Sequence, residues 1–276
     1  MPPVYKATLN NRTEKMTTPT AIQSPNRPQW IPLHFSLAFL IKSPRLLGWS
    51  VLLVVLTGGL TWLGYLEAIH LVDGWSGGFF NQQPETSGWW GWLLVKGWLV
   101  LKYLFLAVSR VVAFYLAFLV AYCLTCPGYV FLSTATEKKY RGGVLTAEQG
   151  LSLRGILTDL IEGCKIGLLG LLVTVVALVV NFIPVIGQGL VFVLYTFYSA
   201  LMFVDYPTSN RRWSLGKKIS WLNAHRNRAF RLGLLPALIT LIPIINILFM
   251  ALLFPLFTVH TTLNFTAIED KDLQVA

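Results

Sequence analysis

The chain has 276 residues, of which 55% are hydrophobic and only 12% are charged. A water-soluble domain carries about 25% charged residues, so the composition excludes an ordinary soluble protein and predicts an integral membrane protein. The formal net charge is +10. In a membrane protein, Lys and Arg first mark the cytoplasmic side, so this charge does not indicate a nucleic-acid partner and we expect none.

The N-terminal third of the chain predicts a tail, an interfacial helix and a first span. Residues 1–30 are rich in Thr, Pro, Asn and Gln, and we expect a flexible cytoplasmic tail before a single membrane domain at 31–276. Residues 31–45 are typical of a short amphipathic helix at the membrane surface. Residues 46–72 are long and apolar enough to span the bilayer. The first 50 residues hold six basic residues and one acid, whereas the loop at 73–87 holds two acids and no Lys or Arg, so the N-terminus is predicted to be cytoplasmic.

A second span is predicted at 89–124, where the aromatic sequence "GWWGW" at 88–92 is typical of a membrane interface. Its length as a helix is about 50 Å, more than the hydrocarbon core of about 30 Å, so we expect it to protrude into the cytoplasm. Pro127 and Gly128 predict its end. The polar segment at 133–165 is predicted to be cytoplasmic.

Two later apolar segments, at 166–204 and 232–263, are each interrupted by an Ile-Pro sequence. The two apolar arms of the first are about 22 Å long, and the whole second segment is about 48 Å, too short to cross twice. Both segments border a basic stretch, which favours re-entrant hairpins that begin and end in the cytoplasm. The predicted hairpin apices contain Pro184, Gly187, Gln188, Pro243 and Asn246. Four full spans are the alternative, which the length of the first segment leaves open.

Three stretches carry a resemblance to a known family: "FIPVIGQ" at 182–188, "FYSALMFVDYPTSN" at 197–210 and "RLGLLPALITLIPIIN" at 231–246. Together they resemble the CysZ sulfate-permease family, which is related to the etoposide-induced protein family. The resemblance implies an all-α integral membrane protein with two long transmembrane helices plus two re-entrant hairpins, and both termini in the cytoplasm. It also implies a homo-oligomer in the inner (plasma) membrane that passes sulfate or a similar oxyanion.

The resemblance departs from the family at "SPRLLGWS", residues 43–50. The family has a Pro-Gly-Leu/Ile-Arg-Arg sequence at the start of its first long helix, where glycine amides and an arginine suit an oxyanion. Here Pro44 matches, and Arg45 stands at the place of the glycine. Arg45 is therefore the candidate anion-binding residue at this helix end.

Lys96, Lys102 and Arg110 lie within the second span, within about 120° of one another on one helix face. A charge inside the membrane is costly and suggests a function, here a cationic stripe that lines an anion path. The other interpretation is that Lys96 and Arg110 reach the two interfaces, while Lys102 pairs with an acid or borders a subunit contact. Glu67 is a candidate partner for Lys96.

A cytoplasmic basic face is predicted between the two hairpins. It consists of Arg211, Arg212, Lys217, Lys218, Arg226, Arg228 and Arg231. Such a face binds anionic lipid headgroups or gathers anions at a channel mouth. Asp205, the one acid nearby, is expected to pair with an arginine or to end the returning arm.

The residues indicate no enzyme, metal site or cofactor. The four histidines are scattered, and the chain has no Gly-x-x-x-x-Gly-Lys-Ser/Thr sequence for ATP. The sequence therefore predicts an anion channel or transporter, with sulfate uptake as its first candidate activity and no ATPase of its own. A non-transporting scaffold or lipid-interacting membrane protein on the same fold is the alternative.

Overall fold

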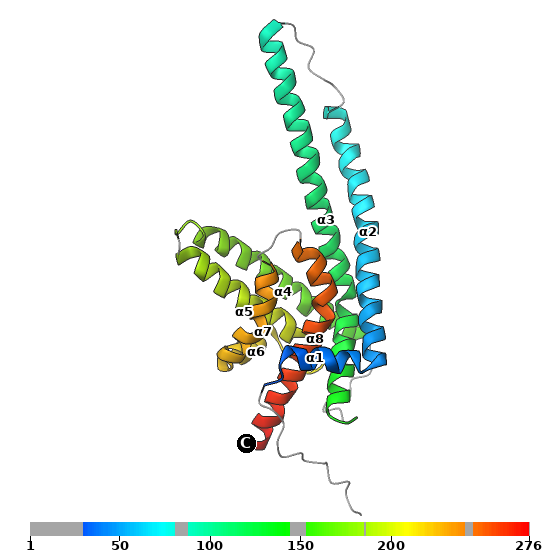
Figure 1. The fold of residues 1–276 in the computed structure, drawn as a ribbon, viewed down its shortest axis with the longest axis vertical. Coiled ribbons are helices and arrows are strands. Elements are labelled where there is room, and N and C mark those ends of the chain that lie inside the picture. The colour runs from blue at the N-terminus through cyan, green and yellow to red at the C-terminus, as the bar shows by residue number, and fades with distance from the viewer. Residues whose placement is uncertain (1–29, 81–87, 144–152, 185, 241–244, 276) are drawn as a thin grey trace, which may run out of the picture.

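The computed structural model describes residues 30–80, 88–143, 153–184, 186–240 and 245–275, and these residues form eight helices and no strand (Figure 1). The helices are α1 Leu33–Ile41, α2 Pro44–Phe80, α3 Gly88–Tyr140, α4 Leu153–Val180, α5 Ile186–Ser209, α6 Leu215–Ala224, α7 Arg226–Thr240 and α8 Ile245–Val275. The prediction of an all-helical fold is confirmed. The tail at 1–29 and the predicted apex residue Pro243 lie outside the described residues.

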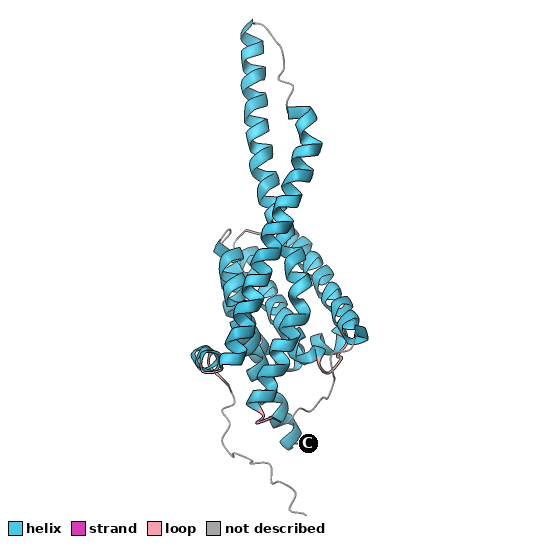
Figure 2. Ribbon diagram, turned by 90° about the vertical axis from the view of Figure 1, so that its right-hand side faces the viewer, coloured by secondary structure: helices cyan, strands magenta, loops and turns pink. Residues whose placement is uncertain are grey.

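The pair α2–α3 dominates the shape of the molecule. The two helices run side by side and extend well beyond the others (Figures 1 and 2). Their 37 and 53 residues correspond to about 55 and 80 Å. We call the base the region at the other end, formed by α1, α4 to α8, the start of α2 and residues 113–140 of α3.

The prediction of a loop at 73–87 was wrong for the first part of this segment, because α2 continues to Phe80. Two local contacts accompany the extra turns. The hydroxyl of Ser76 donates a hydrogen bond to the carbonyl of Val72 at 2.6 Å, and Arg110 Nη2 lies 3.3 Å from Asp73 Oδ2. The rest of the predicted loop, at 81–87, lies outside the described residues.

The helix end predicted at Pro127 was also wrong, since α3 continues through this proline to Tyr140. A proline inside a helix removes one hydrogen bond, but tertiary packing can outweigh that loss. Here the residues after the proline are buried in the base, including Tyr129, Leu132 and Ser133. Ser133 Oγ lies 2.8 Å from Thr262 Oγ1 on α8 and so holds the continuation in place.

Helix α8 lies at the centre of the base, in contact with α1, α2, α3, α5 and α7. Its aromatic residue Phe254 packs against Tyr129 of α3 and Phe203 of α5, with ring centroids 4.7 and 4.6 Å apart. The same helix buries a series of polar side chains, among them Thr258, Thr262, Asn264 and Thr266. It runs well past residue 263, where the second hairpin was predicted to end.

The predicted interfacial helix at 31–45 is shorter than expected and is attached to α8. The Asn264 side chain accepts a hydrogen bond from the Ile31 amide at 2.9 Å and donates one to its carbonyl at 3.0 Å. Ser36 Oγ lies 2.9 Å from His260 Nδ1. One side of α1 therefore packs on α8, while Phe35 and Ile41 are exposed.

Helices α4 and α5 form a hairpin, which projects from the rest of the base obliquely to α2–α3 (Figure 1). Its helices have 28 and 24 residues, or about 42 and 36 Å, so each helix continues beyond the apolar arm of about 22 Å that the sequence predicted. By length and apolar composition, five helices in the described residues could cross a membrane, namely parts or all of α2, α3, α4, α5 and α8. Re-entry of the two hairpins stays a prediction.

The base also contains a close crossing of α5 and α7. Small residues Ala229, Gly233 and Ala237 follow one another at four-residue intervals on α7, and all are buried. Such a pattern lets two helix backbones approach closely. A Cβ atom at Gly233 would overlap the carbonyl oxygen of Thr196 on α5 and lie 2.9 Å from the Ala200 amide nitrogen.

Candidate functional site

The three cations predicted to form a stripe lie in the N-terminal half of α3. Lys96 is exposed, and Lys102 is half-buried with its Nζ 5.1 Å from the centroid of the Trp98 ring. Arg110 forms the 3.3 Å ion pair with Asp73 of α2 described above. In the described part of the chain, no ion pair joins Lys96 to Glu67. The pairing with an acid that the second interpretation assigned to Lys102 is thus seen for Arg110, through Asp73.

Arg45 is the second residue of α2, and its side chain is exposed. Asp73, which marks the level of Arg110, lies 28 residues further along the same helix, or about 42 Å away. Lys96 and Lys102 precede Arg110 on the antiparallel helix α3, so they lie further still from Arg45. Within one chain, Arg45 and the cations of α3 therefore do not form one compact site.

The predicted apex residues of the first hairpin lie at the turn between α4 and α5. Pro184 is in the turn, and its carbonyl accepts a hydrogen bond from the Ile186 amide at 2.7 Å. Gly187 is buried at the start of α5, where a Cβ atom would overlap the Val180 carbonyl oxygen. Gln188 is exposed. In the second hairpin, Asn246 lies in the first turn of α8.

A cluster of charged residues at the base was missed by the sequence analysis. We call it the base network; it consists of Glu137, Arg141, Arg211, Glu269 and Asp270. Arg211 donates two hydrogen bonds to Glu137, at 2.7 and 3.2 Å, and binds Glu269 through Nε at 2.7 Å and through Nη2. Arg141 lies 3.0 Å from Glu137, 3.0 Å from Glu269 and 2.8 Å from Asp270.

The base network joins the end of α3, the segment after α5 and the last part of α8. Burial lowers the pKa of Arg211, but its hydrogen bonds to Glu269 and Glu137 outweigh this effect and raise the pKa above its ordinary value. Three carboxylates surround two guanidinium groups. An incoming anion would have to displace a carboxylate, so the geometry favours a structural clamp over an anion site.

A second buried ion pair joins α5 to α6. Lys218 Nζ lies 2.6 Å from Asp205 Oδ1, and the two side chains are 1% and 6% exposed. The prediction that Asp205 pairs with an arginine was therefore wrong, because its partner is Lys218. Arg211 and Lys218 must also be removed from the predicted exposed basic face, because both lie inside the base with carboxylate partners.

Five residues of the predicted basic face remain at the surface. Arg212, Lys217, Arg226 and Arg231 are exposed, and Arg228 is half-buried. Lys217 Nζ lies over the Trp213 ring at 4.4 Å, and the Arg231 guanidinium lies over Trp30 at 5.7 Å. Among the described residues, no group of three or more His, Cys, Asp or Glu side chains is placed to hold a metal ion.

These features define a multi-pass helical membrane protein with charged clusters at its base and cations along one long helix. Residues 33–251 match the family described as sulfate transporter CysZ/etoposide-induced protein 2.4, and the chain belongs to this family. The family match confirms the resemblance seen in the sequence. No curated protein matches the chain at a significant level.

Proposed function

We propose that the protein is an inner-membrane anion channel or transporter without its own ATPase, and that sulfate is its first candidate substrate. The observation that carries this proposal is membership of a family whose description names sulfate transport. The cations on α3 give the proposal a physical basis. Lys102 and Arg110 lie within an apolar candidate span, where a charged side chain suggests contact with an ion or another polar group.

The path is proposed to form between copies of the chain. Apolar neighbours of Lys102 and Arg110 on α3 face outward, and Leu104 and Val111 are 58% and 65% exposed. One α2–α3 pair encloses no interior, because two helices have only one contact surface. A homo-oligomer that packs these exposed faces together would bring the cations of several copies around a common path.

Arg45 is proposed to act at the cytoplasmic entrance of this path. It lies in the first turn of α2, where unpaired backbone amides and the helix dipole favour anions. Its side chain is exposed and so is accessible to an ion. This arrangement requires both termini to lie in the cytoplasm and both hairpins to begin on the cytoplasmic side, as the distribution of Lys and Arg predicts.

A scaffold or lipid-interacting protein is the second candidate function. The specific observation in its favour is that Arg141, Arg211 and Lys218, which are buried in the base, all have carboxylate partners. The base thus uses these cations for its own cohesion. The five surface residues of the basic face are suited to anionic lipid headgroups instead.

Sulfate uptake into proteoliposomes tests the first function. Replacement of Lys102 by alanine is expected to reduce saturable uptake about tenfold, the factor that corresponds to about 1.4 kcal/mol. Lys138→Ala is the matched control. It removes the same charge from the same helix, but Lys138 is exposed in the last turn of α3, about 54 Å from Lys102.

Equal loss of uptake in both variants would contradict a path along α3. Absence of uptake above that of empty liposomes, for wild-type protein that is folded and oligomeric, would overturn the transport proposal and support the scaffold. An Arg45→Ala variant adds a second test, because a residue at the entrance is expected to raise the sulfate concentration needed for half-maximal uptake.

A further inference from the structure

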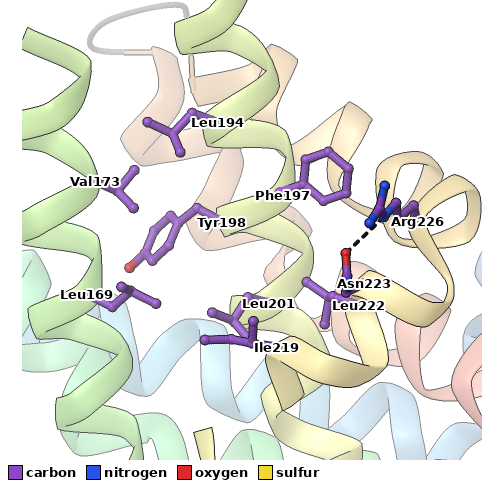
Figure 3. Close-up of a pocket in the computed structure, with 10 residues that line it drawn as sticks. All are labelled: Leu169, Val173, Leu194, Phe197, Tyr198, Leu201, Ile219, Leu222, Asn223 and Arg226. Atoms are coloured by element: carbon purple, nitrogen blue, oxygen red, sulfur yellow. Dashed lines mark hydrogen bonds between the residues drawn. The ribbon is translucent and has the colours of Figure 1, made fainter. Parts of the chain in front are cut away.

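A cleft of about 420 Å³ opens between α4, α5 and α6 (Figure 3). Ligand pockets in proteins have volumes of about 300–1,000 Å³, so the cleft has the size of a binding site. Eight of its ten lining residues are apolar or aromatic. They are Leu169 and Val173 of α4, Leu194, Phe197, Tyr198 and Leu201 of α5, and Ile219 and Leu222 of α6.

The polar part of the cleft lies at one end. Asn223 and Arg226 lie beside each other there, away from Leu169 and Val173 (Figure 3). Arg226 Nε donates a hydrogen bond to Asn223 Oδ1 at 2.8 Å, which fixes the guanidinium but leaves its two terminal amino groups available. No ion pair joins Arg226 to a carboxylate in the described part of the chain, in contrast to Arg110, Arg141 and Arg211.

The helices around the cleft also change from apolar to basic, from the end near Leu169 and Val173 to the end near Arg226. Helices α4 and α5, which form two walls of the cleft, also carry exposed apolar side chains, such as Leu172, Val176 and Leu190. Both helices are candidate membrane spans. Helix α6, by contrast, is short and carries the exposed Lys217, while its Lys218 is buried against Asp205 and adds no free charge. The cleft thus leads from a surface suited to hydrocarbon to a cationic corner suited to the membrane interface.

We propose that this cleft binds one anionic phospholipid, with an acyl chain against Val173, Leu194 and Tyr198 and the headgroup phosphate on Arg226. The apolar walls exclude a free inorganic anion as the natural occupant, because it would leave most of the cleft unfilled. Both kinds of phospholipid carry a phosphate, but the positive charge of Arg226 repels the quaternary ammonium of a zwitterionic choline headgroup, which favours an anionic phospholipid. The site does not depend on whether the protein conducts sulfate.

Native mass spectrometry of the full chain, titrated with phosphatidylglycerol or phosphatidylcholine, tests this proposal. Wild-type protein is expected to retain one phosphatidylglycerol more tightly than phosphatidylcholine. Arg226→Ala is expected to weaken phosphatidylglycerol binding about tenfold, since a charge-assisted hydrogen bond is lost. Arg231→Ala, the matched control on the same helix, is expected to bind like wild type because Arg231 lies over Trp30 and does not line the cleft.

A second variant tests the apolar end. Val173 is half-buried, so tryptophan can replace it without breaking the core, and Val173→Trp is expected to abolish retention of the lipid by filling the cleft. Equal losses in Arg226→Ala and Arg231→Ala would overturn the proposal in favour of a diffuse basic surface. Unchanged binding in Val173→Trp, together with competition by inorganic phosphate, would overturn it in favour of a simple phosphate site.

Discussion

Replacement of Arg211 by methionine is expected to destabilise the protein by about 3–5 kcal/mol, the range for removal of one partner from a buried ion pair. Methionine keeps most of the length of the side chain but removes every hydrogen bond to Glu137 and Glu269. Three carboxylates would then share Arg141 alone. The midpoint of thermal unfolding, measured on purified protein in detergent, reports this loss.

Lys217→Met is the matched control for this change. Lys217 and Arg211 both lie over an aromatic ring, Trp213 at 4.4 Å and Phe265 at 5.0 Å. Lys217, however, is exposed, and within the described residues it forms no ion pair with a carboxylate of the base network. We expect the control to change stability by less than about 1 kcal/mol. Adding Glu137→Gln to Arg211→Met should recover part of the loss, because it removes a stranded charge. Equal unfolding midpoints for Arg211→Met and Lys217→Met would show that the base network is not a clamp.

Replacement of Gly233 by alanine is expected to destabilise the protein by about 3 kcal/mol, near the upper end for overpacking. The added methyl group would overlap the backbone of α5 at Thr196, and a backbone cannot rotate away as a side chain can. Helices α5 and α7 would have to separate, which would disturb the packing of Ala229 and Ala237 as well. The unfolding midpoint and the fraction of monodisperse protein measure the effect.

Gly167→Ala on α4 is the control for Gly233→Ala. Nothing lies within 4 Å of a Cβ atom at Gly167, so the change tests helix propensity alone. Alanine is favoured over glycine inside a helix by about 1 kcal/mol, and the control is therefore expected to be neutral or stabilising. The two variants should differ in sign. A stabilising effect of Gly233→Ala would contradict the close crossing.

The all-helical membrane fold and the family could be predicted from the sequence, because apolar length and the Ile-Pro sequences are local signals. The helix ends could not be predicted in this way. Proline suggested a stop at residue 127, yet Pro127, Pro207 and Pro255 all lie within helices. At each of these positions the surrounding residues are buried in the base, and packing outweighs the lost hydrogen bond.

The base network was missed because its members come from distant parts of the chain. Glu137 and Arg211 are 74 residues apart, and Arg211 and Glu269 are 58 apart. The surplus of Lys and Arg around Arg211 suggested a solvated face, and composition does not distinguish a paired arginine from an exposed one. One local signal was present: Glu137 and Arg141 have the four-residue spacing of a helical ion pair.

The close crossing at Gly233 had a clearer signal in the sequence. Ala229, Gly233 and Ala237 follow the small-residue spacing that is typical of tight helix contacts in membranes. The spacing identifies the face of α7 that packs closely. It does not identify α5 as the partner, which depends on the tertiary arrangement. The cations of α3 pose the same difficulty, because in the proposed path they would face residues of another copy of the chain.

In the proposed transport function, a positive charge at residue 102 faces the anion path. Its most direct test is sulfate uptake by Lys102→Cys in a background with Cys123, Cys126 and Cys164 replaced by alanine. We predict that the cysteine variant loses uptake, that a methanethiosulfonate reagent adding an aminoethyl group restores it, and that one adding a sulfonatoethyl group does not. The same uptake after both reagents, or full uptake before either, would contradict the claim.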